Sequence, residues 1–121
     1  MMAKVLIVDD MASMRKMVAF TLESVGHEVT SAEDGDVALE IGKKDSFDLV
    51  ITDVNMPNMD GITLTKSLRE LAAFKFTPIL LLTTEAGKDK KMEGKAAGAT
   101  GWLVKPFDPD KLLSTIKRVL G

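Results

Sequence analysis

Short apolar runs alternate with longer segments of helical periodicity along this chain. The runs are rich in Val, Ile or Leu and end in turn residues, a pattern typical of strands buried on both faces of a parallel sheet. They predict strands over residues 4–8, 48–52, 79–83 and 102–104, and residues 27–31 are predicted to form a further, short strand. Apolar residues recur at helical spacing in the intervals that follow, which predicts helices over residues 14–25, 37–41, 62–71, 88–97 and 109–120. Five successive βα units predict an α/β fold with a parallel sheet.

Capping residues mark where several of these helices begin. Asp34 and Asp60 precede the second and third helical segments, where an aspartate accepts hydrogen bonds from the first free N–H groups of a helix. Asp108 stands before a proline, whose fixed φ suits the first helical position. These three aspartates therefore predict the starts of the second, third and fifth helices.

The fourth predicted helix, over residues 88–97, has the weakest pattern. It contains Gly94 and several lysines but only Met92 and alanines to bury. Glycine costs about 1 kcal/mol relative to alanine in the interior of a helix. We therefore expect this helix to be among the least stable elements of the fold.

Acidic residues and one lysine stand where predicted strands end. Asp9 and Asp10 follow the first strand, Asp53 follows the third and Lys105 follows the fifth. The carboxyl ends of parallel strands share one edge of the sheet, and ligands bind at that edge in open α/β folds. Two like charges about 4 Å apart repel by roughly 4 kcal/mol at an effective dielectric of about 20, so three carboxylates would cost about 12 kcal/mol. One lysine does not offset this cost, whereas a divalent cation that prefers oxygen ligands does.

The composition limits the classes of function. With 16 basic and 18 acidic residues the net charge is −2, and no run of Lys or Arg indicates binding to a nucleic-acid backbone. Cysteine is absent, which excludes disulfides and cysteine nucleophiles. Without a signal peptide or a membrane-spanning apolar stretch, we expect a cytoplasmic protein with no membrane insertion. The length of 121 residues leads us to expect one domain over residues 1–121 and no output domain.

The polar residues at the strand ends resemble those of a known family, the receiver domain of bacterial response regulators. The resemblance covers the whole chain and is strongest to single-domain chemotaxis members. It rests on Asp9-Asp10-Met11-Ala12-Ser13-Met14-Arg15, Asp53, Asn55-Met56-Pro57, Thr83-Thr84-Glu85-Ala86 and Lys105-Pro106-Phe107. It implies a flavodoxin-like, doubly wound sheet of five parallel strands in the order 2-1-3-4-5, for which this family is a standard example.

The resemblance implies roles for the residues at the strand ends. Asp53 would be the phosphoacceptor, and Lys105 would pair with the phosphoryl oxygens. Asp10, Asp53 and the backbone carbonyl of Asn55 would ligate Mg²⁺, while Asp9 would act mainly through a bound water. Phosphoryl transfer needs positioning and charge neutralisation more than acid–base chemistry, and Mg²⁺ needs only one or two carboxylates, so both requirements suit this set.

The resemblance also implies a switch and residues that tune its lifetime. The Thr83 hydroxyl would hydrogen-bond the phosphoryl oxygens once they arrive. Trp102 stands where related proteins commonly carry tyrosine, and it would be the aromatic switch residue. Asn55 and Glu85 lie two residues beyond Asp53 and Thr83, and the family uses these two positions to tune hydrolysis.

A stand-alone member of this family would be a phosphorylation-activated response regulator in two-component signalling. It would accept phosphate from a histidine kinase of the CheA type and control a flagellar motor switch protein in chemotaxis, with a phosphatase as a further partner. It would promote its own phosphorylation and dephosphorylation without being a conventional enzyme. We expect a monomer that does not bind nucleic acid.

Two other functions stay open at this point. A stand-alone receiver could instead relay phosphate to a histidine phosphotransfer protein or serve as a scaffold, and nothing in the sequence separates these roles from motor control. An aspartyl-phosphate phosphatase of the haloacid dehalogenase type also uses a strand-end aspartate with Mg²⁺, and Asp53-Val54-Asn55 loosely matches its signature. In that class, however, the nucleophile follows the first strand and a larger body or cap binds the substrate.

Overall fold

Strands and helices alternate in the computed structural model, which describes residues 2–84, 88–106 and 108–120. The strands are β1 (Lys4–Val8), β2 (Glu28–Ala32), β3 (Leu49–Asp53), β4 (Ile79–Thr83) and β5 (Gly101–Val104). The helices are α1 (Ala12–Ser24), α2 (Gly35–Lys44), α3 (Gly61–Arg69), α4 (Lys88–Ala97) and α5 (Pro109–Leu120), with a short 3₁₀ helix η1 (Ala72–Phe74). Each predicted segment forms the element that was predicted, and the ends differ by a few residues.

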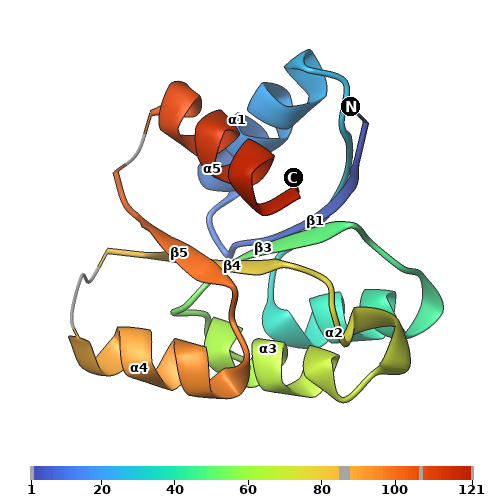
Figure 1. Ribbon diagram of the computed structural model, residues 1–121, viewed down its shortest axis with the longest axis vertical. Helices are drawn as coiled ribbons and strands as arrows, with labels where there is room; N and C mark the ends of the chain where they lie inside the picture. Colours follow the sequence, from blue (N-terminus) through green and yellow to red (C-terminus); the bar gives the residue numbers. More distant parts are fainter. Residues whose placement is uncertain (1, 85–87, 107, 121) are drawn as a thin grey trace.

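All five strands are parallel, in the order β2-β1-β3-β4-β5. Helices α1 and α5 cover one face of the sheet, and α2, α3 and α4 cover the other (Figure 1). This confirms the flavodoxin-like α/β fold and the implied strand order. The chain leaves β1 for β2 on one side and then crosses to β3 on the other, so the carboxyl ends of β1 and β3 flank the point where the winding reverses. Ligands bind at such a point in open α/β sheets.

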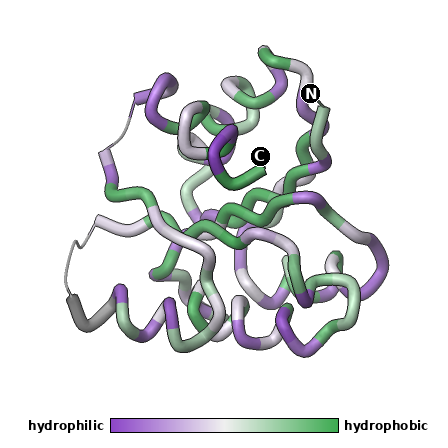
Figure 2. The backbone as a smooth tube through the Cα atoms, in the orientation of Figure 1, coloured by the Kyte–Doolittle hydropathy of each residue, from purple (hydrophilic) through white to green (hydrophobic). Residues whose placement is uncertain are grey.

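The three central strands β1, β3 and β4 are buried on both faces, apart from the half-buried Lys4, as their apolar runs predict. The edge strands are more exposed: only Ala32 of β2 and Leu103 of β5 are buried, so the expectation of burial on both faces is wrong for residues 102–104. Along β1, Val5 and Ile7 belong to the core under α1 and α5, whereas Leu6 and Val8 belong to the core under α2 and α3. Figure 2 shows hydrophobic residues concentrated along the central strands. A central sheet packed on both sides is rigid, and it holds the polar groups at its edge in fixed positions.

The predicted caps are present at the starts of three helices. Asp34 accepts a hydrogen bond from the Gly35 amide, Asp60 accepts one from the Thr63 amide, and Asp108 accepts one from the Lys111 amide, at 2.7 Å in each case. No helix in the described part of the chain is long and apolar enough to cross a membrane.

Helix α4 approaches the sheet through small residues. Among residues 91–97, only Gly94 and Ala97 are buried. A Cβ placed on Gly94 would lie 2.6 Å from Leu81 Cδ1, so the glycine permits close contact with β4. The low apolar content noted in the sequence therefore corresponds to few buried residues over 91–97, the part of α4 whose side chains the structure describes.

Candidate functional site

Three carboxylates meet at the carboxyl ends of β1 and β3. One oxygen from each of Asp9, Asp10 and Asp53 lies within 4.8 Å of the others. The two strands are adjacent and in register, with Val8 opposite Thr52, which brings the residues that follow them together. Asp9 and Asp53 are buried and Asp10 is exposed. The crowding of carboxylates predicted from the sequence is therefore present.

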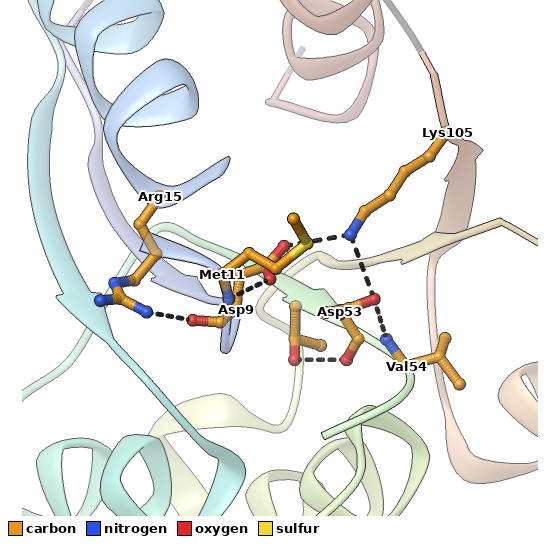
Figure 3. A network of polar contacts seen from close by, with 7 residues as sticks. Asp9, Met11, Arg15, Asp53, Val54 and Lys105 are labelled. Carbon is orange, nitrogen blue, oxygen red and sulfur yellow. Dashed lines mark hydrogen bonds and ion pairs between the residues drawn. The ribbon is translucent and has the colours of Figure 1, made fainter. Parts of the chain in front are cut away.

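Asp9 is held by several donors around it. Its Oδ1 accepts a hydrogen bond from the Met11 amide at 2.9 Å, and its Oδ2 lies 3.2 Å from Lys105 Nζ. Arg15 Nη1 donates to the Asp9 backbone carbonyl at 2.6 Å (Figure 3). Both carboxylate oxygens of Asp9 thus already have donors from the protein. Asp10, which is exposed, offers the more accessible oxygens of the pair.

Asp53 and Lys105 form the second half of this network. Lys105 Nζ lies 3.4 Å from Asp53 Oδ1, and the same oxygen accepts a hydrogen bond from the Val54 amide at 2.9 Å (Figure 3). Burial and the neighbouring charge of Asp9 raise the pKa of Asp53, and Lys105 opposes that shift. One ammonium group is therefore shared between two buried carboxylates, which leaves the site negative.

Gly61 allows α3 to begin directly against the backbone of Asp53. A Cβ on Gly61 would collide with the Asp53 carbonyl oxygen. The Gly61 amide donates to the Val54 carbonyl at 2.9 Å. The residue next to Asp53 is thereby fixed to the start of the helix.

The donor set fits Mg²⁺. This ion prefers oxygen ligands, keeps several waters and typically uses one or two protein carboxylates. An open groove of about 530 Å³ adjoins the cluster at Asp10, which leaves space for a hydrated ion, and it is lined by Asp10, Asn55, Met56, Pro57 and Asp60. Asn55 is exposed on this groove. Asp10, Asp53 and Asn55 are thus the residues whose oxygens suit the ion.

The predicted switch residues lie around one small gap. Its volume is about 10 Å³, and it is lined by Val54, Leu81, Thr83, Lys91 and Trp102. Thr83 is buried at the end of β4, while Trp102 on β5 is half-buried. Lys91 Nζ lies 5.4 Å from the centroid of the Trp102 ring. The structure therefore brings Thr83 and Trp102 together and adds Lys91, to which the sequence analysis gives no role.

Two further parts of the motifs that carry the resemblance follow β4 and β5 in the chain. The Lys105-Pro106 peptide bond is cis. Glu85, predicted to tune hydrolysis, lies outside the described residues.

Asp34 was predicted only as a helix cap, but its carboxylate also accepts hydrogen bonds from the Asn58 and Met59 amides. No local pattern in the sequence signals this second role.

Comparisons with known proteins agree with the fold and the site. A family model described as the response regulator receiver domain matches residues 5–117. The chemotaxis protein CheY-3 of Vibrio cholerae is 41% identical over 96% of this chain and 90% of that protein. The chemotaxis protein CheY of Pseudomonas aeruginosa is 38% identical over 96% of this chain and 94% of that protein. The chain belongs to the response regulator receiver domain family.

Within that family, the chain is a CheY-like receiver. The structure of V. cholerae CheY4 superposes with a TM-score of 0.95 at 56% identity, covering 98% of this chain and 99% of that one. The receiver domain of a P. aeruginosa sensor histidine kinase, 26% identical with a TM-score of 0.92, covers all of this chain and 99% of its own, and it was solved with a magnesium ion in its active-site cleft. The cluster of Asp9, Asp10 and Asp53 matches the receiver Mg²⁺ site. A receiver domain is a phosphoacceptor rather than a conventional enzyme, and its family implies a histidine kinase as partner.

Proposed function

We propose that Asp53 accepts a phosphoryl group from a histidine kinase of the CheA type and that the phosphorylated protein controls the flagellar motor switch in the cytoplasm. The observation that carries this proposal is the position of Asp53, a buried carboxylate between Lys105 and the two aspartates that end β1. The names and the extent of the CheY relatives support the role in chemotaxis.

The chemical step is an in-line displacement at phosphorus. A carboxylate oxygen of Asp53 forms the new P–O bond while the P–N bond of phosphohistidine breaks, and the imidazole leaves with the bonding electron pair and takes up a proton. Asp10, Asp53 and the backbone carbonyl of Asn55 hold the Mg²⁺, whose charge offsets that of the phosphoryl oxygens. Lys105, already 3.4 Å from Asp53, pairs with these oxygens from the other side.

Hydrolysis ends the signal. Water attacks the phosphorus of the aspartyl phosphate, and the P–O bond to Asp53 breaks to regenerate the carboxylate. Asn55 lines the groove through which a water approaches, so its side chain tunes the rate of this step. We assign Glu85 the same role in hydrolysis, because it stands at a position that the family uses to tune this step. Replacing Asn55 with a bulky apolar residue then changes the decay rate without preventing phosphorylation.

The output is a change of binding on the face formed by α4, β5 and α5. The Thr83 hydroxyl binds the phosphoryl oxygens, and its movement makes room for Trp102 to turn inward. The half-buried Trp102 and the weakly buried α4 both lie on this face, which supports it as the surface that changes.

The test is binding to two kinds of partner. We expect phosphorylation by a CheA-type kinase to raise the affinity for a peptide from a flagellar motor switch protein, and we expect Asp53→Asn to remove the effect. An unchanged affinity for that peptide, together with rapid transfer of the phosphoryl group to a histidine phosphotransfer protein, would instead identify a phosphorelay component.

A further inference from the structure

Asp34 is a buried carboxylate outside the cluster at the strand ends. It is only 3% exposed, although it stands in the turn between β2 and α2. Its Oδ1 accepts hydrogen bonds from the Gly35 amide at 2.7 Å and the Met59 amide at 2.8 Å. Its Oδ2 accepts one from the Asn58 amide at 3.2 Å. Capping α2 explains the first contact, whereas the other two reach the loop between β3 and α3.

The two segments are packed too closely for side chains to separate them. A Cβ on Gly35 would collide with the Met59 carbonyl oxygen. The turn after β2 and the loop after β3 therefore lie against one another at the backbone. The Asp34 carboxylate joins the two segments by accepting hydrogen bonds from the Asn58 and Met59 amides.

The loop is held on both sides of Asn55. On one side the Val54 amide donates to the Leu82 carbonyl at 3.0 Å, and the Val54 carbonyl accepts from the Gly61 amide. On the other side Asp34 holds Asn58 and the residue after it. Only residues 55–57 lie between these anchors, and the last of them is a proline with a restricted φ. The direction of the Asn55 carbonyl is therefore set by its neighbours.

The charge of Asp34 matters for this arrangement. Burial opposes ionisation of the carboxyl group, but the hydrogen bonds from the Met59, Asn58 and Gly35 amides outweigh it and lower its pKa. Hydrogen bonds from N–H groups to an ionised carboxylate are about twice as strong as neutral ones. An asparagine has the same shape, but it offers one acceptor oxygen and would place an NH₂ group against one of these amides.

We infer that Asp34 is a positioning residue that holds the loop after β3 and thereby sets the Mg²⁺ affinity of the site. The inference rests on the proposed function, because it takes the Asn55 carbonyl as a ligand of the ion. Partners that orient metal ligands commonly change affinity by roughly 10- to 100-fold when they are replaced. Asp34 holds the loop that carries the ligand instead of the ligand itself, so the lower end of that range is expected.

The experiment is a calorimetric Mg²⁺ titration of the unphosphorylated protein. We expect Asp34→Asn to weaken Mg²⁺ binding by roughly tenfold, while the phosphorylation rate at saturating Mg²⁺ stays at the wild-type value. Asp108→Asn is the matched control, since it makes the same change at the cap of α5, and it should bind Mg²⁺ as the wild type does. Wild-type affinity in a folded Asp34→Asn protein would overturn the inference.

A second measurement needs no variant. Binding energies couple reciprocally, so Mg²⁺ should slow hydrogen exchange at the Asn58 and Met59 amides of the wild-type protein. Unchanged exchange at both amides on saturation with Mg²⁺ would also overturn the inference, even if Asp34→Asn does not fold. Asp10→Asn tests the proposed metal site separately from the role of Asp34. If this variant binds Mg²⁺ as tightly as the wild type, the proposed metal site itself is wrong.

Discussion

The Asp53 side chain lies in a place that disfavours its charged form. Burial and the charge of Asp9 raise its pKa, and Lys105 only partly opposes them. A folded carboxylate with a raised pKa weakens the fold when it is deprotonated. The same negative surroundings favour a bound cation, so the cost in stability and the capacity to bind Mg²⁺ have one origin.

The raised pKa of Asp53 predicts that the stability of the fold depends on pH. As pH rises from the ordinary carboxyl pKa through the raised pKa of Asp53, the folded state binds more protons than the unfolded state, so the free energy of unfolding should fall. Asp53→Asn should remove this loss and be more stable than the wild type near neutral pH without Mg²⁺, by roughly 1 kcal/mol. Urea denaturation across this pH range measures both effects.

The matched control for this experiment is Asp48→Asn. Asp48 is an exposed carboxylate at the opposite edge of the sheet, where it accepts a hydrogen bond from the Lys4 amide at 2.8 Å. Its replacement should keep the contribution of Asp53 to the pH profile. If the free energy of unfolding depends on pH in the same way in the wild type and in Asp53→Asn, the charge of Asp53 does not weaken the fold.

Lys91 should restrain Trp102 before phosphorylation. A cation over an indole ring stabilises its position by about 0.5–1 kcal/mol at an exposed site. Lys91→Met should therefore make Trp102 more accessible to a soluble quencher, while Lys95→Met, on the exposed side of the same helix, should not. Trp102 is the only tryptophan, so its fluorescence reports the change directly. Equal quenching in both variants would contradict the restraint.

The main site residues can be predicted because each stands where an apolar strand segment ends. Asp9, Asp53 and Lys105 come together since the ends of parallel strands share an edge. The contacts of Asp34 and Lys91 cannot be predicted in this way. Asp34 bonds to amides 24 and 25 residues further along the chain, and the contact of Lys91 depends on how α4 is rotated against β5.

Helix α4 is secured at its carboxyl end by a side chain of α3. Arg69 donates to the Gly98 carbonyl from Nε at 3.0 Å and from Nη2 at 2.8 Å. Its Nη1 donates to the Phe74 and Thr77 carbonyls, each at 2.6 Å. One guanidinium group therefore joins the ends of α3, η1 and α4.

Removing this connection should loosen one end of α4. Arg69→Met should destabilise the protein by about 2–4 kcal/mol, because three partly buried carbonyls lose a charged donor. Arg69→Lys should recover little, since an ammonium group cannot span these carbonyls as a planar fork does. Lys66→Met, an exposed change on the same helix, is the control. Thermal unfolding measures the effect, and a Lys variant as stable as the wild type would contradict this role.

Helix α4 should also exchange its amide hydrogens faster than α5. In α5, Leu112, Thr115 and Ile116 are buried, whereas residues 91–97 of α4 bury only a glycine and an alanine. Fewer buried contacts mean a lower free energy of local opening. Hydrogen exchange resolved by residue measures this, and equal protection in the two helices would contradict the expectation.

Periodicity predicts the strands and helices better than their ends. The third helix is predicted to reach Leu71 but ends at Arg69, and η1 follows where no helix is predicted. Leu71 still packs against the core from outside the helix, so the pattern of burial continues after the helical backbone stops. Burial periodicity reports which side chains face the core and does not fix where the hydrogen-bonded helix ends.

At the scale of the whole molecule, the proposed function couples the site at the sheet edge to the face formed by α4, β5 and α5. The gap of about 10 Å³ beside Thr83 and Trp102 is far too small for an indole ring, so Trp102 can turn inward only if residues that line the gap move, and we propose that Thr83 is the one that does. A phosphoryl group on Asp53 brings the acceptor oxygens that draw the threonine hydroxyl. Under the proposed function, phosphorylation would thus shift an equilibrium between two packings of this face.

This coupling predicts how Thr83→Ala behaves. The variant should still be phosphorylated, because Asp53 and its neighbours are intact, but the change in Trp102 quenching and the gain in partner affinity should both be weaker. The measurement is quenching and peptide binding on the same phosphorylated samples. If phosphorylation of the wild type raises partner affinity while Trp102 accessibility stays the same, Trp102 is not the coupling residue.

The phosphorylated residue itself can be located chemically. The protein is incubated with a small acyl phosphate, with and without Mg²⁺, and the aspartyl phosphate is reduced with borohydride and mapped by mass spectrometry. We predict one phosphoryl group per chain, on Asp53, formed only with Mg²⁺ and absent from Asp53→Asn, with a higher Mg²⁺ requirement in Asp10→Asn. Stable, Mg²⁺-dependent labelling of another residue in a folded Asp53→Asn protein would contradict the assignment of Asp53 as the phosphoacceptor.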